Sequence, residues 1–297
     1  MVQANAESNT DLFRALKGGS NNFGVVTRFD LSTFKQGRMW GGAVYFAVTA
    51  YGDLVQKFYD FASNPTPDPN AHLIAATGFT GQGEACVADI YYAKPTPTPA
   101  SLEPFTTIQP QLFNTLREDS LLGLANEQAS FSTDGDRQLY FTTTFRLNKQ
   151  FMLDIHGLYN KTLEDIKPVP GLSLSLVFQP LTKHLLHQTA SKCDNSLGLS
   201  PDNGPLVILL LNSVHSNKTD DATIVDAVTG LLEDIDRLAS ERGVAERYRF
   251  MNYAFKSEKP IEGYGSENVR KLKAASEKYD KSGFFQERVP GGFKLPR

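Results

Sequence analysis

A glycine-rich stretch near the N-terminus holds the first residues whose types could do chemistry. Gly18, Gly19 and Gly24 stand in the run Gly-Gly-Ser-Asn-Asn-Phe-Gly. Such a turn can direct several backbone N–H groups at an anion such as a phosphate, because glycine adopts φ > 0 and lets another group approach the chain closely. A tight turn leading into a buried strand explains the glycines equally well. The run matches neither the GxxxxGK(S/T) nor the GxGxxG pattern.

The histidines and cysteines offer a second kind of chemistry. His184 and His187 stand three residues apart, so one face of a helix could present both rings to a metal ion. No Asp or Glu follows at matching spacing, which favours surface or capping histidines. Cys86 and Cys193 form no metal motif, and we interpret them as buried free thiols. The sequence therefore predicts no metal site.

Two stretches at opposite ends of the chain resemble one known family. The run DLFRALKGGSNNFGVVTRF, from Asp11 to Phe29, closely resembles a signature of FAD-linked oxidoreductases. The family is the vanillyl-alcohol oxidase / p-cresol methylhydroxylase superfamily, and specifically its berberine-bridge-enzyme-like branch with many fungal oxidases. Far along the chain, the run FMNYA from Phe250 to Ala254 resembles the YxNYA motif of that family. The residues that follow, through Leu295, resemble its C-terminal segment.

The resemblance implies FAD as the cofactor and assigns candidate residues to it. It implies that a flavin accepts a hydride from a small organic substrate while a base removes a proton from the neighbouring hydroxyl, amine or phenol. Asn252 is then expected to hydrogen-bond the flavin, and Tyr253 to line the site as the candidate proton carrier. Backbone groups near the glycine run are expected to contact the FAD, namely those of Asn22, Gly24, Val25 and Val26.

The chain departs from the family at one position of the second motif. Its first tyrosine, a base candidate in some members, is Phe250 here, which cannot take a proton. This weakens the expectation of conventional alcohol oxidation. Tyr253 could also be a packed aromatic residue whose hydroxyl is bonded to the backbone.

A further departure concerns the N-terminal lobe of the family. By resemblance, that lobe holds the FAD pyrophosphate in a glycine-rich loop and carries the His, and in many members the Cys, that link to the flavin. No such loop precedes Gly18, and no Cys or His of this sequence lies in a matching context. We therefore expect a family fragment, a truncated gene product, or a chain that works with a separately encoded FAD-binding lobe.

Composition excludes several other functions. The formal net charge is −3 and the pI is near 6.0, which gives no electrostatic attraction for nucleic acid or an anionic membrane. No apolar run approaches the roughly 20 residues of a membrane helix. Residues 1–10 lack the apolar core of a signal peptide. As written, the chain is expected in the cytoplasm, although its full-length relatives are often secreted.

Hydrophobic periodicity predicts an α+β fold. Helical spacing of apolar residues predicts helices over 53–62, 151–166, 220–242 and 266–279. Alternation and β-branched or aromatic content predict strands over 26–34, 39–48, 73–79, 85–93, 138–147, 172–178 and 206–211. We expect a large, mostly antiparallel sheet flanked by helices, together with a remnant of the FAD-binding lobe. In residues 172–178 the alternation is strict, and the more polar face could line a substrate cavity or face solvent.

The resemblance divides this fold into three parts. Residues 1–37 would end the FAD-binding lobe, residues 38–245 would form the substrate domain, and residues 246–297 would return to the lobe.

Two function classes remain. The first is an FAD-dependent oxidoreductase acting on a small molecule, such as a secondary metabolite, with electrons passing to oxygen. The second is a non-catalytic module that binds a ligand or partner, or one half of a split enzyme.

Overall fold

A single antiparallel sheet forms the centre of the computed structural model, which describes residues 1–132, 134–191 and 195–297. Within these residues the sheet has nine strands in the order β4-β1-β3-β2-β7-β8-β6-β9, and β5 also pairs with β1. The strands are β1 Met39–Ala47, β2 Ala71–Thr80, β3 Gly83–Tyr92, β4 Gln111–Asn114, β5 Arg117–Asp119, β6 Arg137–Arg146, β7 Ser173–Leu181, β8 Leu206–His215 and β9 Ala245–Glu246. The predicted α+β fold with a large antiparallel sheet is confirmed.

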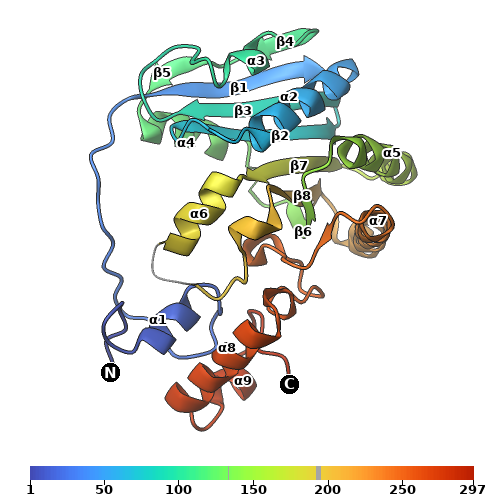
Figure 1. Cartoon of the computed structure of the whole chain (residues 1–297). Coiled ribbons are helices and arrows are strands. Elements are labelled where there is room, and N and C mark those ends of the chain that lie inside the picture. The colour runs from blue at the N-terminus through green and yellow to red at the C-terminus, as the bar shows by residue number, and fades with distance from the viewer. Residues whose placement is uncertain (133, 192–194) are drawn as a thin grey trace.

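Three amphipathic helices cover one face of the sheet: α2 Tyr51–Ser63, α5 Lys149–Ile166 and α7 Asp221–Glu241 (Figure 1). Along α5, Phe151, Ile155 and Tyr159 recur every four residues, so they form one buried stripe. The other α-helices are α1 Thr10–Leu16, α3 Glu103–Thr106, α4 Leu121–Ala129, α6 Lys183–Ser191, α8 Ser266–Tyr279 and α9 Phe284–Glu287. Among the helices of the described residues, none has the length and apolarity needed to cross a bilayer.

The strands divide their side chains between two different environments. In β7, Leu174, Leu176 and Phe178 are buried against the helices, whereas the alternate residues from Ser173 to Gln179 are only partly buried. This follows from the period of two residues in a strand. The main core therefore lies between the sheet and α2, α5 and α7, and the opposite face keeps polar side chains accessible.

A second, smaller core joins the two ends of the chain. Apolar residues of α1 and the following turn pack against those of the C-terminal region, and Ile208 of β8 connects this cluster to the sheet. Its buried members from the two ends are Leu12, Ala15, Phe23, Tyr248, Ile261, Tyr264, Leu272, Ala275 and Leu295. In Figure 1, α1, α8 and α9 lie together below the sheet, with both termini nearby. The domain boundaries at residues 37 and 245 stay predictions.

The strand predicted over residues 26–34 is wrong. This segment runs as an extended connection from the α1 region to β1, without a strand partner among the described residues (Figure 1). Val25, Phe29, Leu31 and Phe34 are 75% to 82% exposed. The alternation is present, but a strand needs a neighbour for its backbone groups, and none of the described segments supplies one.

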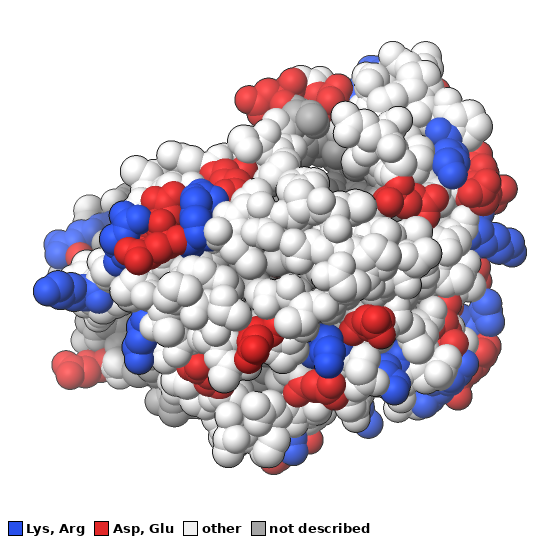
Figure 2. All heavy atoms as spheres, turned by 90° about the horizontal axis from the view of Figure 1, so that it is seen from above, with Lys and Arg blue, Asp and Glu red and all other residues white. Residues whose placement is uncertain are grey.

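The surface above the β4 edge is weakly charged. In Figure 2, which views the molecule from above Figure 1, Lys, Arg, Asp and Glu lie mostly at the periphery and leave a broad uncharged area. At the periphery, positive and negative side chains lie next to one another. β4 contributes the exposed Leu112 and Phe113 at this edge.

Replacing Phe178 tests the main core. Its ring lies 6.1 Å from that of Phe58 on α2 and 6.4 Å from that of Phe145 on β6, measured between ring centroids. Phe178→Ala removes a buried ring and leaves a cavity, so we expect it to lower the free energy of unfolding by about 3–5 kcal/mol in urea denaturation. The control Leu122→Ala, at an exposed position, should change it by no more than about 0.5 kcal/mol. Equal effects would contradict this assignment of the core.

Candidate functional site

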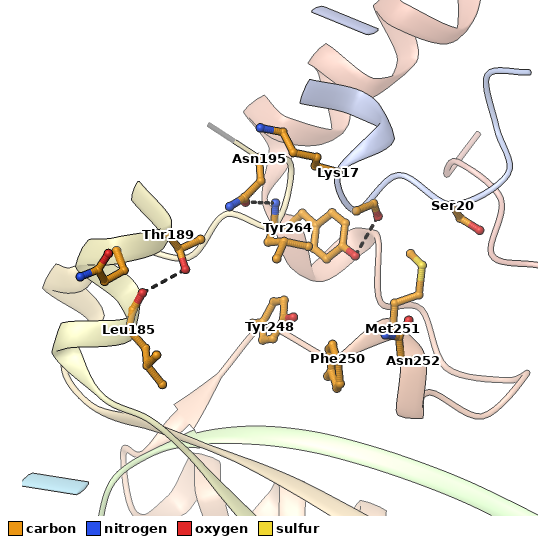
Figure 3. Close-up of a pocket in the computed structure, with 13 residues that line it drawn as sticks. Lys17, Ser20, Leu185, Thr189, Asn195, Tyr248, Phe250, Met251, Asn252 and Tyr264 are labelled. Atoms are coloured by element: carbon orange, nitrogen blue, oxygen red, sulfur yellow. Dashed lines mark hydrogen bonds between the residues drawn. The ribbon is translucent and has the colours of Figure 1, made fainter. Parts of the chain in front are cut away.

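A cavity of about 680 Å³ lies between three parts of the chain. The turn after α1 contributes Lys17, Gly18 and Ser20, and α6 contributes Leu185, Gln188 and Thr189. The third wall is the segment from Tyr248 to Asn252, with Tyr264 beside it (Figure 3). The volume falls within the range of about 300–1,000 Å³ of small-molecule sites. The cavity therefore brings together the two stretches that resemble the family motifs.

Gly18 shapes the turn at this cavity. Its φ is +114°, and a Cβ there would lie 2.6 Å from the side chain of Leu197, so only glycine fits without strain. The carbonyl of Gly18 accepts a hydrogen bond of 3.0 Å from the hydroxyl of Tyr264. The turn is thus held directly against the C-terminal region.

Two buried phenols form the aromatic part of the cavity wall. The rings of Tyr248 and Tyr264 are stacked, with centroids 6.2 Å apart. Burial raises the pKa of Tyr248 to about 12, and burial also raises the pKa of Tyr264. Both groups therefore stay neutral near pH 7 and neither is suited to act as a base. Together with Phe250, Met251 and Leu197 they give the cavity a largely apolar surface with polar groups at few positions.

Asn252 is the polar side chain that the second motif directs to the cavity. It lines the cavity and is exposed, and its amide makes no hydrogen bond within the described residues. An amide has donors and an acceptor, so Asn252 is available to a ligand. Phe250, which replaces the tyrosine of the motif, lies in the same wall.

Tyr253 points away from this cavity toward the sheet. Its hydroxyl accepts a hydrogen bond of 2.7 Å from the Nε2 of Gln179 on β7. Its ring meets the rings of Phe250 and Tyr140 edge-on, with centroid distances of 4.8 and 5.6 Å. The aromatic packing of the alternative interpretation is therefore present, and the hydrogen bond that the hydroxyl accepts comes from a side chain. The structure places Tyr253 next to Asn252 in sequence, but on the side of this segment that faces the polar face of the sheet.

Asn22 is fully buried and joins the two ends of the chain. Its Nδ2 donates to the carbonyls of Gly19, at 2.7 Å, and Phe293, at 2.9 Å. Its Oδ1 accepts a hydrogen bond of 2.7 Å from Nε2 of Gln286, and its backbone carbonyl accepts one of 3.1 Å from Ser276. The side-chain amide is thus used within the chain, and it does not line the cavity.

Gly24, Val25 and Val26 lie where the chain leaves this turn. No atom lies within 4 Å of a Cβ built on Gly24, and Val25 and Val26 are exposed. Their backbone groups form no hydrogen bond with the described residues. The structure does not bring these three residues to the cavity wall that holds Asn252.

Sequence reasoning missed Gln179 and Arg249, which fix the second motif in place. Arg249 forms ion pairs with Asp236 of α7 and with Glu258, and it donates to the carbonyl of Thr142 on β6. Burial raises the pKa of Glu258, an effect that Arg249 partly offsets. These bonds hold the segment before Phe250 at the edge of the sheet. Arg249 stands directly before the motif, which was a usable signal, whereas Gln179 had only its place on the polar face of a predicted strand.

The described residues contain no group of three or more His, Cys, Asp or Glu side chains placed to hold a metal ion. His184 contacts Gln188 within α6, at 3.4 Å between its Nε2 and the amide nitrogen. Cys86 is a buried free thiol, and burial raises its pKa. Cys193, predicted to be the second buried thiol, lies outside the described residues.

Comparison with known proteins identifies the family. No family model matches the chain. The sequence is 33% identical over 313 residues to the FAD-dependent monooxygenase tpcD of Cochliobolus heterostrophus, covering 99% of this chain and 59% of that protein. It is 30% identical over 311 residues to the FAD-dependent monooxygenase CTB5 of Cercospora nicotianae, covering 100% of this chain and 67% of that protein.

Solved structures agree on the fold. The BBE-like 1 protein of Physcomitrella patens superposes with a TM-score of 0.72 at 15% identity, covering 100% of this chain and 63% of the other. The chain therefore has the fold of part of a BBE-like protein, and it belongs to the family of FAD-dependent monooxygenases that includes CTB5. It spans 59% of the length of the first of these relatives.

Replacing Asn22 tests how the turn is held. Asn22→Asp turns a donor to two carbonyls into a carboxylate that faces them, so a buried repulsion replaces two hydrogen bonds. We expect a loss of about 1–3 kcal/mol in the free energy of unfolding and faster amide exchange in residues 285–296. The control Asn21→Asp keeps an acceptor for Lys294 and should have little effect. Unchanged exchange in Asn22→Asp would show that the amide does not hold the C-terminal segment.

Proposed function

We propose that this chain supplies the substrate side of an FAD-dependent oxidoreductase, in which a small organic molecule gives a hydride to the flavin. The observation that carries the proposal is the cavity itself, because its walls come from the two stretches that resemble the family motifs. The names of the relatives, FAD-dependent monooxygenases, support the cofactor. Acceptance of the electrons by oxygen is part of the same proposal.

The residues of the cavity fit a flavin ring. A flat heteroaromatic ring needs an apolar wall and a few hydrogen-bonding groups at its edge. Tyr248, Phe250 and Met251 supply the wall, and the unbonded amide of Asn252 supplies a donor and an acceptor. When bound, the flavin would accept the hydride, while the protein orients the substrate and excludes water. We also propose that backbone groups of Asn22, Gly24, Val25 and Val26 contact the rest of the FAD; those of residues 24–26 are unbonded within the described chain.

Tyr253 is the proposed proton carrier. Phe250 cannot fill this role, and Tyr248 and Tyr264 are kept neutral by burial. The amide of Gln179 donates to the hydroxyl oxygen of Tyr253 and so fixes the position of that hydroxyl. Held in this way, the hydroxyl faces the polar face of the sheet, where we propose that it lies against the substrate hydroxyl and relays its proton.

The second candidate function is a binding module that works with a separate FAD-binding lobe. The exposed apolar side chains of Val25, Phe29, Leu31 and Phe34 support this candidate. An extended segment with free backbone groups is suited to pair with a strand of another polypeptide. In this case the isolated chain would hold no flavin.

Uptake of FAD is the first test. We would record the visible absorption spectrum of the purified chain before and after adding FAD and desalting. A retained flavin band is expected if the cavity binds the ring. Asn252→Leu removes the free amide and should weaken uptake at least tenfold, whereas Asn126→Leu, an exposed amide on α4 outside the cavity, should not. A colourless wild-type chain would contradict cofactor binding by this chain alone and favour the second candidate.

Loss of the Tyr253 hydroxyl tests the chemical role. In flavin-loaded protein, we expect Tyr253→Phe to slow reduction of the flavin by about 10²–10⁴-fold, measured by anaerobic stopped flow with a panel of aromatic and sugar alcohols. Gln179→Leu should slow the same step less than Tyr253→Phe does, because it removes the donor that positions the hydroxyl but keeps the hydroxyl itself. Tyr140→Phe, whose ring contacts Tyr253 only edge-on, is the matched control. Full activity in Tyr253→Phe excludes it as the proton carrier.

A further inference from the structure

A second group of polar side chains lies on the face of the sheet opposite α2, α5 and α7. Asp89 and Tyr91 are on β3, and their strand neighbours Ala88 and Ile90 belong to the main core. Because side chains alternate along a strand, Asp89 and Tyr91 point to the other face. This is the face that also carries Gln179 and its partner Tyr253.

The register of the strands places Asp89 in one row with Gln179. Asp89 pairs with Ile74 of β2, and the next residue, Ala75, pairs with Phe178 of β7. Ile74 therefore lies beside Gln179. Two strand spacings of about 4.8 Å separate Asp89 from Gln179, or about 10 Å in all. A small molecule of two fused rings spans this distance.

The carboxyl group of Asp89 has few hydrogen-bond donors within the described residues. Nε2 of Gln128 on α4 donates to Oδ1 of Asp89 at 3.1 Å and to the hydroxyl of Tyr91 at 2.8 Å. Within the described residues Asp89 forms no ion pair. The nearby Arg117 pairs with Glu127 and Asp119 instead. An ionised carboxylate has room for about four donors, and here the described chain supplies one.

Burial makes this carboxyl group sensitive to pH near neutrality. It raises the pKa of Asp89 to about 6, with Gln128 opposing the shift and the charge of Glu127 adding to it. The other titratable or charged groups around Asp89 are Tyr45 on β1, His72 on β2, Tyr91 on its own strand and Arg117 on β5. The pKa of Tyr91 is raised to about 12, so it stays neutral. Above pH 6, Asp89 is thus a partly buried anion without a cation.

The surroundings of Asp89 are aromatic. The ring of Tyr91 stacks with that of His72 at a centroid distance of 6.4 Å, and Tyr45 stacks with Phe113 at 4.3 Å. Between Asp89 and Gln179 the row holds only the aliphatic Ile74. The row is therefore an apolar surface with one hydrogen-bond acceptor, the carboxylate of Asp89, at the end away from Gln179.

We propose that Asp89, held by Gln128 and beside Tyr91, is a specificity-determining subsite that accepts a hydrogen bond from a hydroxyl or ammonium group of the substrate. It lies about 10 Å along the row of strands from Gln179, which contacts Tyr253 at the reacting end. The proposal deepens the function proposed above. It rests on that function, because the bound molecule is a substrate only if the protein is an oxidoreductase. It assigns the substrate class as aromatic or fused-ring molecules with a donor group remote from the carbon that is oxidised.

Binding of three naphthalene probes tests the subsite without flavin or turnover. The probes are 2-naphthol, 2-(aminomethyl)naphthalene and, as the probe without a donor, 2-methoxynaphthalene, each titrated into the full chain between pH 5 and 8 and followed by NMR. Affinity for the two donor probes should rise as pH passes through about 6, where Asp89 ionises, and 2-methoxynaphthalene should show no such rise. A preference for the amine over the naphthol would identify the donor as cationic.

Variants separate Asp89 from its neighbours. Asp89→Asn should reduce binding of the donor probes at pH 7.5 at least tenfold and abolish the pH dependence, whereas the control Asp60→Asn, at an exposed position on α2, should keep both. Gln128→Ala, an exposed change on α4, should move the pH midpoint upward because it removes the group that lowers the pKa of Asp89. Equal affinity for all three probes, or a pH dependence that survives in Asp89→Asn, would overturn the proposal.

The result is separable from the test of FAD uptake. If the pH-dependent binding is found but the chain does not retain FAD, the proposed function fails, and the Asp89 subsite stands as a binding site. If FAD is retained but the probes do not distinguish Asp89 from Asn, the subsite fails alone. The thermal unfolding midpoint gives an independent check of folding. Asp89→Asn should be more stable than wild type above pH 6, because a raised folded-state pKa means that stability is lost as pH rises from about 4 to 6.

Discussion

The two-sided nature of the antiparallel sheet is the constraint on which the rest of the molecule depends. Alternate residues of β7, β8 and β3 are buried beneath α2, α5 and α7, and this burial provides the main driving force for folding. Because stability is supplied on one face, the other face is free to hold polar groups that a core would reject. Gln179, Asp89 and Tyr91 lie there, on strands whose positions are fixed from behind.

The cavity depends on a different arrangement, in which the ends of the chain meet. Tyr264 reaches the carbonyl of Gly18, and Asn22 bonds both Phe293 and Gln286. The segment from Tyr248 to Tyr253 runs between this small core and the sheet, and Arg249 fixes it to β6 and α7. One short segment thus presents Asn252 to the cavity and Tyr253 to the sheet, so the two polar groups lie on opposite sides of the segment.

The sequence predicted the fold where periodicity was strong and failed where a partner was needed. The strict alternation of residues 172–178 predicted β7 and its polar face, and the stripe of α5 was equally clear. The strand over residues 26–34 was wrong because alternation reports which side chains are apolar and not whether another strand is present. The resemblance found the stretches that form the cavity. It could not find Gln179 or Arg249, because their roles arise from contacts with residues far away in the sequence.

The bonds of Asn22 also determine when the cavity can form during synthesis. Besides the local carbonyl of Gly19, the amide of residue 22 has its partners at residues 286 and 293. Contacts of such long sequence separation are slow to form, and on the ribosome the N-terminal turn must wait until residues 286–293 have emerged. The sheet with its helices can be complete before then. The order of assembly is therefore scaffold first and cavity last, with the turn around Gly18 exposed in the meantime to chaperones and proteases.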